Sequence, residues 1–139
     1  IICDLTDFAH EKYVILHQYP GNARFTGSSL LVYRAIYNLV ENAVKYNVSG
    51  GSVSIYIRQE ASFAIVIIED TGLGIPKSDY EKIFEPFYRI DKSRSRAMGG
   101  TGLGLALVRE IAQQHGGTVQ VLNSSPHGSK IQVTFGGLS

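Results

Sequence analysis

A glycine-rich stretch that begins at Gly99 has the composition of a phosphate-binding loop. Its residues run Gly99-Gly100-Thr101-Gly102-Leu103-Gly104. Glycine has no Cβ, so the backbone can approach a ligand closely, and the start of a helix offers unpaired N–H groups and a positive dipole end. Apolar residues recur at Leu105, Val108 and Ile111, which predicts a helix directly after the stretch. On these residues alone, it is either a phosphate cradle or an ordinary surface loop before a helix.

Polar residues at helical spacing form a second candidate site. They occupy the stripe Asn38, Glu41, Asn42, Lys45, opposite the apolar stripe Ile36, Leu39, Val40, Ala43. Asparagine is a mediocre helix former, so its recurrence on one face favours a role for its amide groups. Amide oxygens and water suit Mg²⁺, and a lysine ammonium can meet a phosphate. The same stripe is equally compatible with a solvated helix face.

An acidic turn follows a continuously apolar run and supplies a third candidate. Asp70 comes just after the run 64–68, which is predicted to be a central strand. Ligands often sit at strand ends in open sheets, and a carboxylate there can accept a hydrogen bond from an amine such as that of adenine. Gly72 and Gly74 would let a planar base approach the backbone. The alternative is an Asx-turn with glycines at positive φ.

Local patterns predict the elements that would position these residues. A long helix is predicted from Leu30 to about Tyr46, with Ser28 or Ser29 as its N-cap. Ser78 is predicted to cap a short helix that ends at Ile83. Strands are predicted within 1–8, 13–16, 23–26, 53–58, 64–68, 118–122 and 130–135, and a mobile loop over 85–98.

Composition limits the class of protein. The chain has 139 residues, of which 44% are hydrophobic and 18% charged, as expected of a single globular domain. A net charge of +1 argues against a general nucleic-acid or membrane-surface binder.

The histidines lack metal-ligand spacing and are predicted to be scattered on the surface; they are His10, His17, His115 and His127. Cys3 is alone and is expected to be a buried, inert thiol. The chain starts at Ile1 without Met, which suggests a piece of a longer protein.

Four stretches in this order resemble one family, the catalytic ATP-binding domain of two-component sensor histidine kinases. This domain belongs to the ATPase superfamily of DNA gyrase, Hsp90 and MutL, which shares the Bergerat fold. The stretch 38–46 resembles its N box, 70–75 its first glycine box, 84–89 its F box and 100–105 its second glycine box. The resemblance spans about residues 30–135, most of the chain.

The resemblance implies roles for the N box. Asn42 would be the Mg²⁺ ligand, with Asn38 helping through the metal or its waters. Lys45 would contact phosphate, and Tyr46 would form part of the nucleotide wall. Glu41 resembles an acidic residue common in the kinases, a candidate acid or base during phosphoryl transfer.

The resemblance also implies roles for the remaining boxes. Asp70 would bind the adenine amine, with Gly72, Gly74 and Ile75 close to the base. Phe84 and Phe87 would anchor the lid. The residues that would close over the phosphates are Gly100, Thr101, Gly102, Leu103, Gly104 and Leu105. Lid cations that could reach the γ-phosphate are Arg89, Lys92, Arg94 and Arg96.

One position distinguishes the subfamilies. The hydrolysing members carry a glutamate four residues before the metal asparagine, as the general base for water. This chain has Asn38 there, and an amide cannot take a proton at neutral pH. The resemblance therefore implies transfer of the γ-phosphoryl group to a histidine, for relay to an aspartate of a response regulator. The alternatives are an ATP-dependent clamp and a degenerate nucleotide-binding module.

The resemblance implies a two-layer α/β sandwich, with a mixed, mostly antiparallel sheet, about three helices on one face and a mobile ATP lid. Residues 1–139 would form one catalytic domain with ATP and Mg²⁺ as cofactors. No stretch resembles the box that carries the phospho-accepting histidine, so the dimerisation domain is expected to be absent from this chain. The isolated domain is expected to be a monomer, nearly inactive alone.

Its parent would be a homodimeric, membrane-bound bacterial sensor kinase with this domain in the cytoplasm, without a nucleic-acid partner. The chain also departs from the family pattern at its N-terminal edge, where the segment before the long helix is shorter and Gly27-Ser28 replaces the acidic residue common just before that helix.

Overall fold

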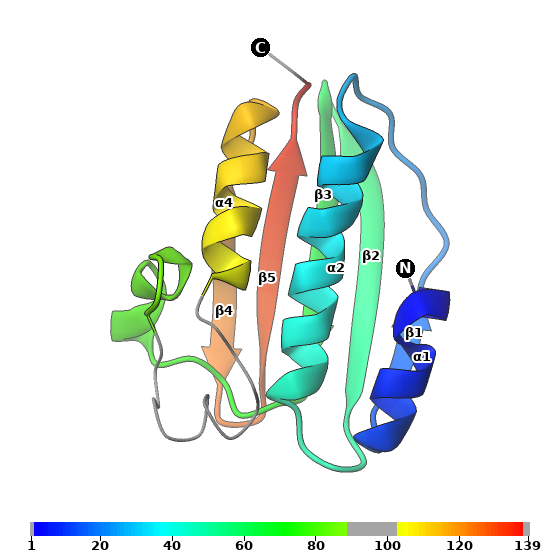
Figure 1. Cartoon of the computed structure of the whole chain (residues 1–139), viewed down its shortest axis with the longest axis vertical. Coiled ribbons are helices and arrows are strands. Elements are labelled where there is room, and N and C mark those ends of the chain that lie inside the picture. The colour runs from blue at the N-terminus through cyan, green and yellow to red at the C-terminus, as the bar shows by residue number, and fades with distance from the viewer. Residues whose placement is uncertain (1, 89–102, 138–139) are drawn as a thin grey trace.

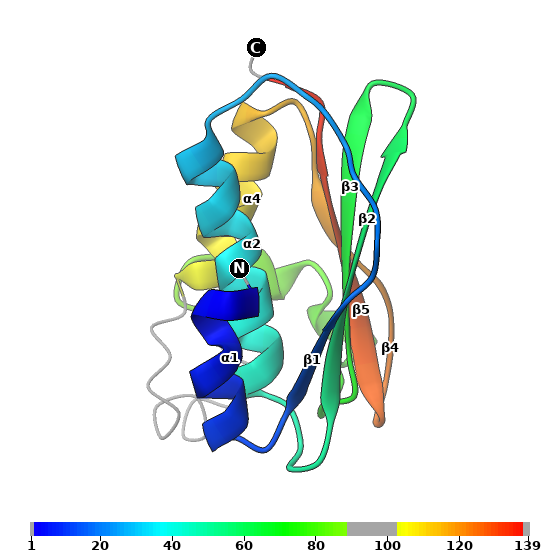
Figure 2. The same cartoon turned by 90° about the vertical axis from the view of Figure 1, so that its right-hand side faces the viewer.

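A five-stranded sheet carries helices on one of its faces and leaves the other face uncovered in the described chain (Figures 1 and 2). The computed structural model describes residues 2–88 and 103–137, with only the backbone at 2–4. The α-helices are α1 (Ile2–Glu11), α2 (Ser29–Lys45) and α4 (Gly104–Gln114). The strands are β1 (Ile15–Gln18), β2 (Ser52–Glu60), β3 (Phe63–Asp70), β4 (Val119–Ser125) and β5 (Gly128–Phe135). This arrangement confirms the predicted two-layer fold.

The strand order in the sheet is β1-β2-β3-β5-β4. Strand β1 runs parallel to β2, and every other neighbouring pair is antiparallel. The sheet is therefore mixed and mostly antiparallel, as predicted. Strand β3 is central, and its end places Asp70 opposite Ser129 of β5 and Val53 of β2.

The core lies between the helices and the sheet. On β3, Ala64, Val66 and Ile68 alternate toward the helices and are buried, as alternation in a strand with one covered face requires. Their packing partners on the helices include Leu39, Val40, Val108 and Ile111. These apolar contacts fix how α2 and α4 lie on the sheet, side by side in Figure 1 and one behind the other in Figure 2.

The long helix forms where its sequence predicted it. Ser28 is the N-cap, and its hydroxyl accepts a hydrogen bond from the Leu31 N–H at 3.2 Å. Val40 is completely buried, Leu39 and Ala43 are buried beside it, and Ile36 is half-buried. The predicted apolar stripe is therefore the core face, and the opposite polar stripe stays partly exposed.

Three predictions of secondary structure are wrong. The first eight residues were predicted to include a strand, but residues 2–8 belong to helix α1, in which Leu5 and Ala9, four residues apart, are buried. Segment 23–26 forms no strand; it crosses the sheet's end, where Phe25 stacks on Phe135. The single short helix predicted up to Ile83 is instead two 3₁₀ turns, η1 (Lys77–Asp79) and η2 (Lys82–Phe84), and Pro76 rather than Ser78 precedes the first.

The prediction of surface histidines is wrong at one position. His10, His17 and His127 are exposed, but His115 is completely buried at the C-terminal end of α4. Its Nε2 accepts a hydrogen bond from the Ser28 N–H at 3.1 Å, so Nδ1 carries the proton and donates to the Ile111 carbonyl at 2.8 Å. His115 thus links the end of α4 to the N-cap of α2.

None of the helices within residues 2–88 and 103–137 has the length and apolar character needed to cross a bilayer. The prediction of a mobile loop over 85–98 falls largely outside the described residues, and the Cys3 side chain also lies outside them.

Candidate functional site

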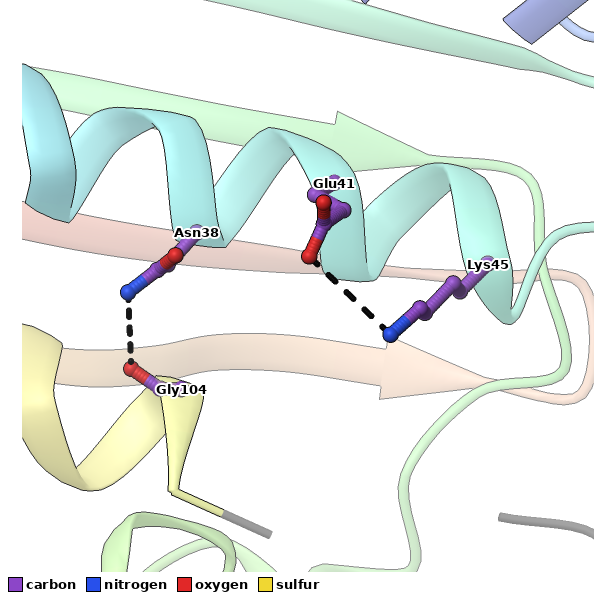
Figure 3. Close-up of polar contacts among 4 residues, drawn as sticks. All are labelled: Asn38, Glu41, Lys45 and Gly104. Carbon is purple, nitrogen blue, oxygen red and sulfur yellow. Dashed lines mark hydrogen bonds and ion pairs between the residues drawn. The ribbon is translucent and has the colours of Figure 1, made fainter. Parts of the chain in front are cut away.

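The polar stripe of α2 faces the start of α4 (Figure 3). Asn38, Glu41, Asn42 and Lys45 are all half-buried, since the neighbouring helix shields them only partly. The Lys45 ammonium lies 4.0 Å from the Glu41 carboxylate one turn earlier. Such a pair adds only about 0.3–0.5 kcal/mol to a helix. Its geometric effect is that the lysine ammonium is held along the same face as the two asparagines.

Within the described residues, the start of α4 carries no side-chain cap. The Asn38 amide donates to the Gly104 carbonyl at 3.5 Å, which joins the polar stripe to the first turn of α4 (Figure 3). No side chain of the described residues caps this helix at its N-cap residue Leu103. A Cβ built on Gly104 would meet no described atom within 4 Å. Packing of the described chain therefore does not require glycine at position 104. Close approach of a ligand to the uncapped helix start would favour glycine there, because it has no Cβ.

Asp70 lies at the end of β3 and is held by strand β5. Its Oδ1 accepts hydrogen bonds from the Gly72 N–H at 2.9 Å and the Ser129 N–H at 3.3 Å. Its Oδ2 accepts from the Ser129 hydroxyl at 2.9 Å. Burial raises the pKa of the Asp70 carboxyl above its ordinary value, and these hydrogen bonds offset only part of that effect. The carboxylate is therefore fixed in orientation before any ligand arrives.

Close backbone contacts within the fold require the glycines that follow Asp70. A Cβ on Gly72 would lie 2.6 Å from the Tyr46 carbonyl oxygen. Gly74 has a φ of 79°, and a Cβ there would lie 2.0 Å from the Ser125 carbonyl oxygen. The sequence suggested that these glycines make room for a base, but close contacts within the fold already account for both.

The turn after β3 is tied to the end of α2. Tyr46 caps the C-terminus of α2, and its carbonyl accepts a hydrogen bond from the Leu73 N–H at 3.3 Å. The half-buried Ile75 donates its N–H to the Ser124 hydroxyl of β4 at 2.6 Å. The predicted base side of the site and its predicted phosphate side are therefore connected through the backbone.

The structure brings most of the predicted residues to one region, between the C-terminal half of α2, the end of β3 and the start of α4 (Figure 1). Leu103 is exposed there and Leu105 is half-buried against the core. Other predicted residues lie outside the described chain: Arg89, Lys92, Arg94, Arg96, Gly100, Thr101 and Gly102.

The F box is only partly an anchor. Phe84 is buried in the core, but Phe87 is 69% exposed at a φ of 66°, so the expectation that both rings pack into the body is wrong for Phe87. The Tyr88 hydroxyl instead donates to the Asp79 carboxylate, and this hydrogen bond raises the pKa of Tyr88. Tyr88 thus fixes the chain to η1 immediately before position 89.

Sequence reasoning missed Ser129, Asn47 and Thr71. Ser129 is buried and supplies two of the three hydrogen bonds to Asp70, yet 59 residues separate them. Only the pairing of β3 with β5 brings them together, and no local pattern predicts that pairing. The Thr71 hydroxyl donates a hydrogen bond to the Asn47 Oδ1 at 3.0 Å across 24 residues. In the sequence, the two are only polar residues, one after the helix and one after Asp70, and no pattern indicates that they are in contact.

The donor set fits a hydrated Mg²⁺ with a nucleotide better than a dedicated metal cage. The described residues contain no cluster of three or more His, Cys, Asp or Glu side chains. Two asparagine amides lie one turn apart on one helix face, beside a lysine and a helix start that no described side chain caps. Mg²⁺ commonly keeps several waters and takes its other ligands from few protein oxygens and from phosphates.

Comparison with known proteins identifies relatives of this arrangement. Residues 27–136 match the family described as "Histidine kinase-, DNA gyrase B-, and HSP90-like ATPase". The chain is 44% identical over 116 residues to the sensor-like histidine kinase SenX3 of Mycolicibacterium smegmatis, covering 84% of this chain and 30% of that protein. It therefore spans less than a third of that relative's length.

Solved structures have the same fold. A structure of the mycobacterial sensor histidine kinase MprB superimposes with a TM-score of 0.77 at 28% identity, covering 99% of this chain and 95% of that one. Full-length ShkA in complex with AMPPNP has a TM-score of 0.81 at 23% identity, covering 97% of this chain and 28% of ShkA. At that identity, the likeness to ShkA shows the fold alone.

Proposed function

This chain belongs to the family of histidine kinase-, DNA gyrase B- and HSP90-like ATPases, and we propose that it binds Mg²⁺ and ATP and donates the γ-phosphoryl group to a histidine on a separate dimerisation domain. Its relatives in sequence are sensor histidine kinases. The chain spans 30% of the length of one of them, SenX3. In this proposal, residues 1–139 are one catalytic domain, and the phosphoacceptor histidine lies elsewhere in the parent protein.

The observation that carries the proposal is the orientation of Asp70. Its carboxylate is half-buried, fixed by Gly72 and Ser129, and lies at the strand end next to the last turn of α2. An acceptor held in this way selects a ligand with an amine at that point, because a mismatched polar group would be left unpaired. Adenine offers such an amine, and Gly72, Gly74 and Ile75 would lie beside the ring.

The phosphates would extend from that point along α2 toward α4. Lys45 would contact them as a point charge, and Asn42 with Asn38 would hold the metal or its waters. The N-terminus of α4, with Leu103, Gly104 and Leu105, would receive phosphate at its positive dipole end. Mg²⁺, when bound, would neutralise negative charge on the β- and γ-phosphates. Tyr46 would form a wall of the site, and Arg89, Gly100, Thr101 and Gly102 would complete it from the segment that follows Tyr88.

The chemistry expected of this site is transfer to a histidine. Asn38 cannot act as a general base for water, so the site would hold ATP without activating hydrolysis. An imidazole nitrogen of the partner domain would attack the γ-phosphorus, the bond to the β–γ bridging oxygen would break, and ADP would leave. Glu41, near Lys45, is the candidate to receive the imidazole proton. The same position argues against an ATP-dependent clamp, which would require hydrolysis.

The proposal places the chain in two-component signalling. The partners would be the dimerisation domain of its parent and a response regulator whose aspartate receives the phosphoryl group. The isolated domain would be monomeric and its parent a homodimer. We place the domain in the cytoplasm, within a membrane-bound bacterial sensor kinase.

The first test is calorimetric titration of the chain with ADP and ATP, with and without Mg²⁺, beside the Asp70→Asn variant. We expect dissociation constants in the micromolar range. A dissociation constant of ~1 μM corresponds to a binding free energy of about −8 kcal/mol. Mg²⁺ should tighten binding and Asp70→Asn should weaken it strongly. Addition of a histidine-bearing dimerisation domain should then yield acid-labile phosphate. A folded chain that binds neither nucleotide would refute the proposal and favour a degenerate module.

A further inference from the structure

Asn47, the second residue after helix α2, makes a hydrogen bond with each polar atom of its side chain. Its Oδ1 accepts from the Val48 N–H at 2.8 Å and from the Thr71 hydroxyl at 3.0 Å. Its Nδ2 donates to the Ser52 carbonyl at 2.9 Å. A half-buried amide whose oxygen and nitrogen are both hydrogen-bonded in this way has one favoured orientation.

Thr71 closes the same network from the other side. Its hydroxyl oxygen accepts a hydrogen bond from the Ser52 N–H at 2.8 Å, while the Thr71 N–H donates to the Ser52 carbonyl at 3.2 Å. The buried Gly51 lies underneath, where a Cβ would be only 2.3 Å from the Asn47 Oδ1 and 2.5 Å from the Thr71 hydroxyl oxygen. The network therefore packs tightly onto the backbone, although Thr71 itself is exposed.

The network joins three segments at the edge of the candidate site. Asn47 follows Lys45 and Tyr46 at the end of α2, Ser52 begins β2, and Thr71 lies between Asp70 and Gly72 after β3. A side chain at position 47 is thus bonded directly to the residue that follows the base-side carboxylate, and it lies two residues after the phosphate-side lysine.

From this geometry we infer that Asn47 is a positioning residue of the nucleotide site, which sets the distance between its base side at Asp70 and its phosphate side at Lys45. The inference rests on the proposed function. Asn47 does not need to touch the nucleotide for this role. Ligands that span two subsites depend on the relative placement of those subsites, whereas a ligand that fills one does not.

The test compares a spanning ligand with a base-only ligand. Asn47→Ala should weaken ADP binding about tenfold or more and change adenosine binding less than about twofold, because the base side keeps its own Ser129 contacts. Binding is read by nuclear magnetic resonance titration, which also reports folding. Asn22→Ala, in the exposed segment after β1, is the matched control and should bind both ligands as the unaltered chain does.

Thr71 provides a second pair of variants. Thr71→Val removes the hydroxyl at nearly constant shape and should reproduce the selective loss of ADP binding, while Thr71→Ser keeps the hydroxyl and should restore it. This pair carries the test if Asn47→Ala does not fold. With ADP bound normally by the unaltered chain, equal losses for ADP and adenosine, or no loss, would overturn the inference alone. Failure of the unaltered chain to bind ADP would overturn the proposed function and this inference together.

Discussion

At the scale of single residues, Asp70 combines burial with a fixed set of donors. Burial raises the pKa of its carboxyl, so between the ordinary value of 3.8 and the raised value the folded chain holds more protons than the unfolded chain. The free energy of unfolding therefore falls as pH rises through that window. The charged carboxylate is thus retained at a cost to stability, which is typical of a functional group.

Asp70→Asn should consequently separate binding from folding. An amide at this position can still accept from the Gly72 N–H and donate to the Ser129 hydroxyl, so at pH 7 we expect an unfolding free energy within about 1 kcal/mol of the unaltered chain, or above it. Urea denaturation measures this. A loss of several kcal/mol would show that the carboxylate is mainly structural.

Adenosine binding should depend on the protonation of the Asp70 carboxyl. As pH falls through the raised pKa of Asp70, the carboxyl gains a proton and loses acceptor capacity, so affinity should fall at a higher pH than an ordinary aspartate would give. Adenosine is the suitable probe because it carries no phosphate to titrate. Asp70→Asn should remove this pH dependence, and a pH profile identical in both chains would contradict the assignment.

Gly104→Ala should change stability and binding in opposite directions. Alanine is favoured over glycine within helices by about 1 kcal/mol, and its Cβ would meet no described atom. We therefore expect an unfolding free energy up to about 1 kcal/mol higher, together with weaker ADP binding because the methyl group would enter the phosphate side. Denaturation and calorimetry on the same sample would check both, and unchanged ADP affinity would argue against phosphate at this helix start.

Residue-level prediction from sequence succeeded where the pattern is local. Asp70 follows a run of apolar residues, and the α2 stripe repeats at helical spacing, so both could be placed from the sequence. Ser129 could not, because its contact with Asp70 depends on strand pairing across 59 residues. The anchoring role of Phe87 came only from the resemblance to the F box, and its ring is 69% exposed at a φ of 66°.

At the scale of elements, one buried imidazole adds a polar link to the apolar packing between α2 and α4. His115 accepts from the Ser28 N–H, donates to the Ile111 carbonyl and packs edge-on against Phe25 and Phe135. It therefore connects the N-cap of the helix that carries the polar stripe to the end of the helix that begins at Gly104.

His115→Ala should destabilise the fold by about 2–5 kcal/mol, since it opens a cavity and leaves the half-buried Ser28 N–H without its partner. Urea denaturation gives the value. His127→Ala removes an exposed histidine and should stay within about 0.5 kcal/mol of the unaltered chain. Equal effects of the two substitutions would contradict the linking role.

Prediction of elements failed at the edges of the domain. Residues 1–8 were predicted to start with a strand because β-branched residues come first, but Leu5 and Ala9 pack onto the core at helical spacing. Alternation over 23–26 correctly reflects which residues are half-buried, yet no neighbouring strand pairs with them in the described chain. Periodicity reports burial, whereas a strand also requires a partner.

At the scale of the whole molecule, any ligand of the folded site should raise the stability of the entire domain. The site combines α2, the end of β3 and the start of α4, so it exists only when both layers are assembled. ADP at a free concentration 100-fold above its dissociation constant should add about 2.7 kcal/mol to the free energy of unfolding. Thermal unfolding with increasing ADP measures this, and Asp70→Asn should show little shift at the same concentrations.

The pairing of β3 with β5 has a consequence for synthesis of the chain on the ribosome. Asp70 is made 59 residues before Ser129, the strand residue that orients it. Strands β1, β2 and β3 can meet early, but the sheet has no neighbour for the other side of β3 until β5 has emerged. A domain generally folds as a unit during synthesis. Nucleotide in the cell would therefore stabilise this domain only after its last strand is complete, and shortened translation products would gain nothing from it.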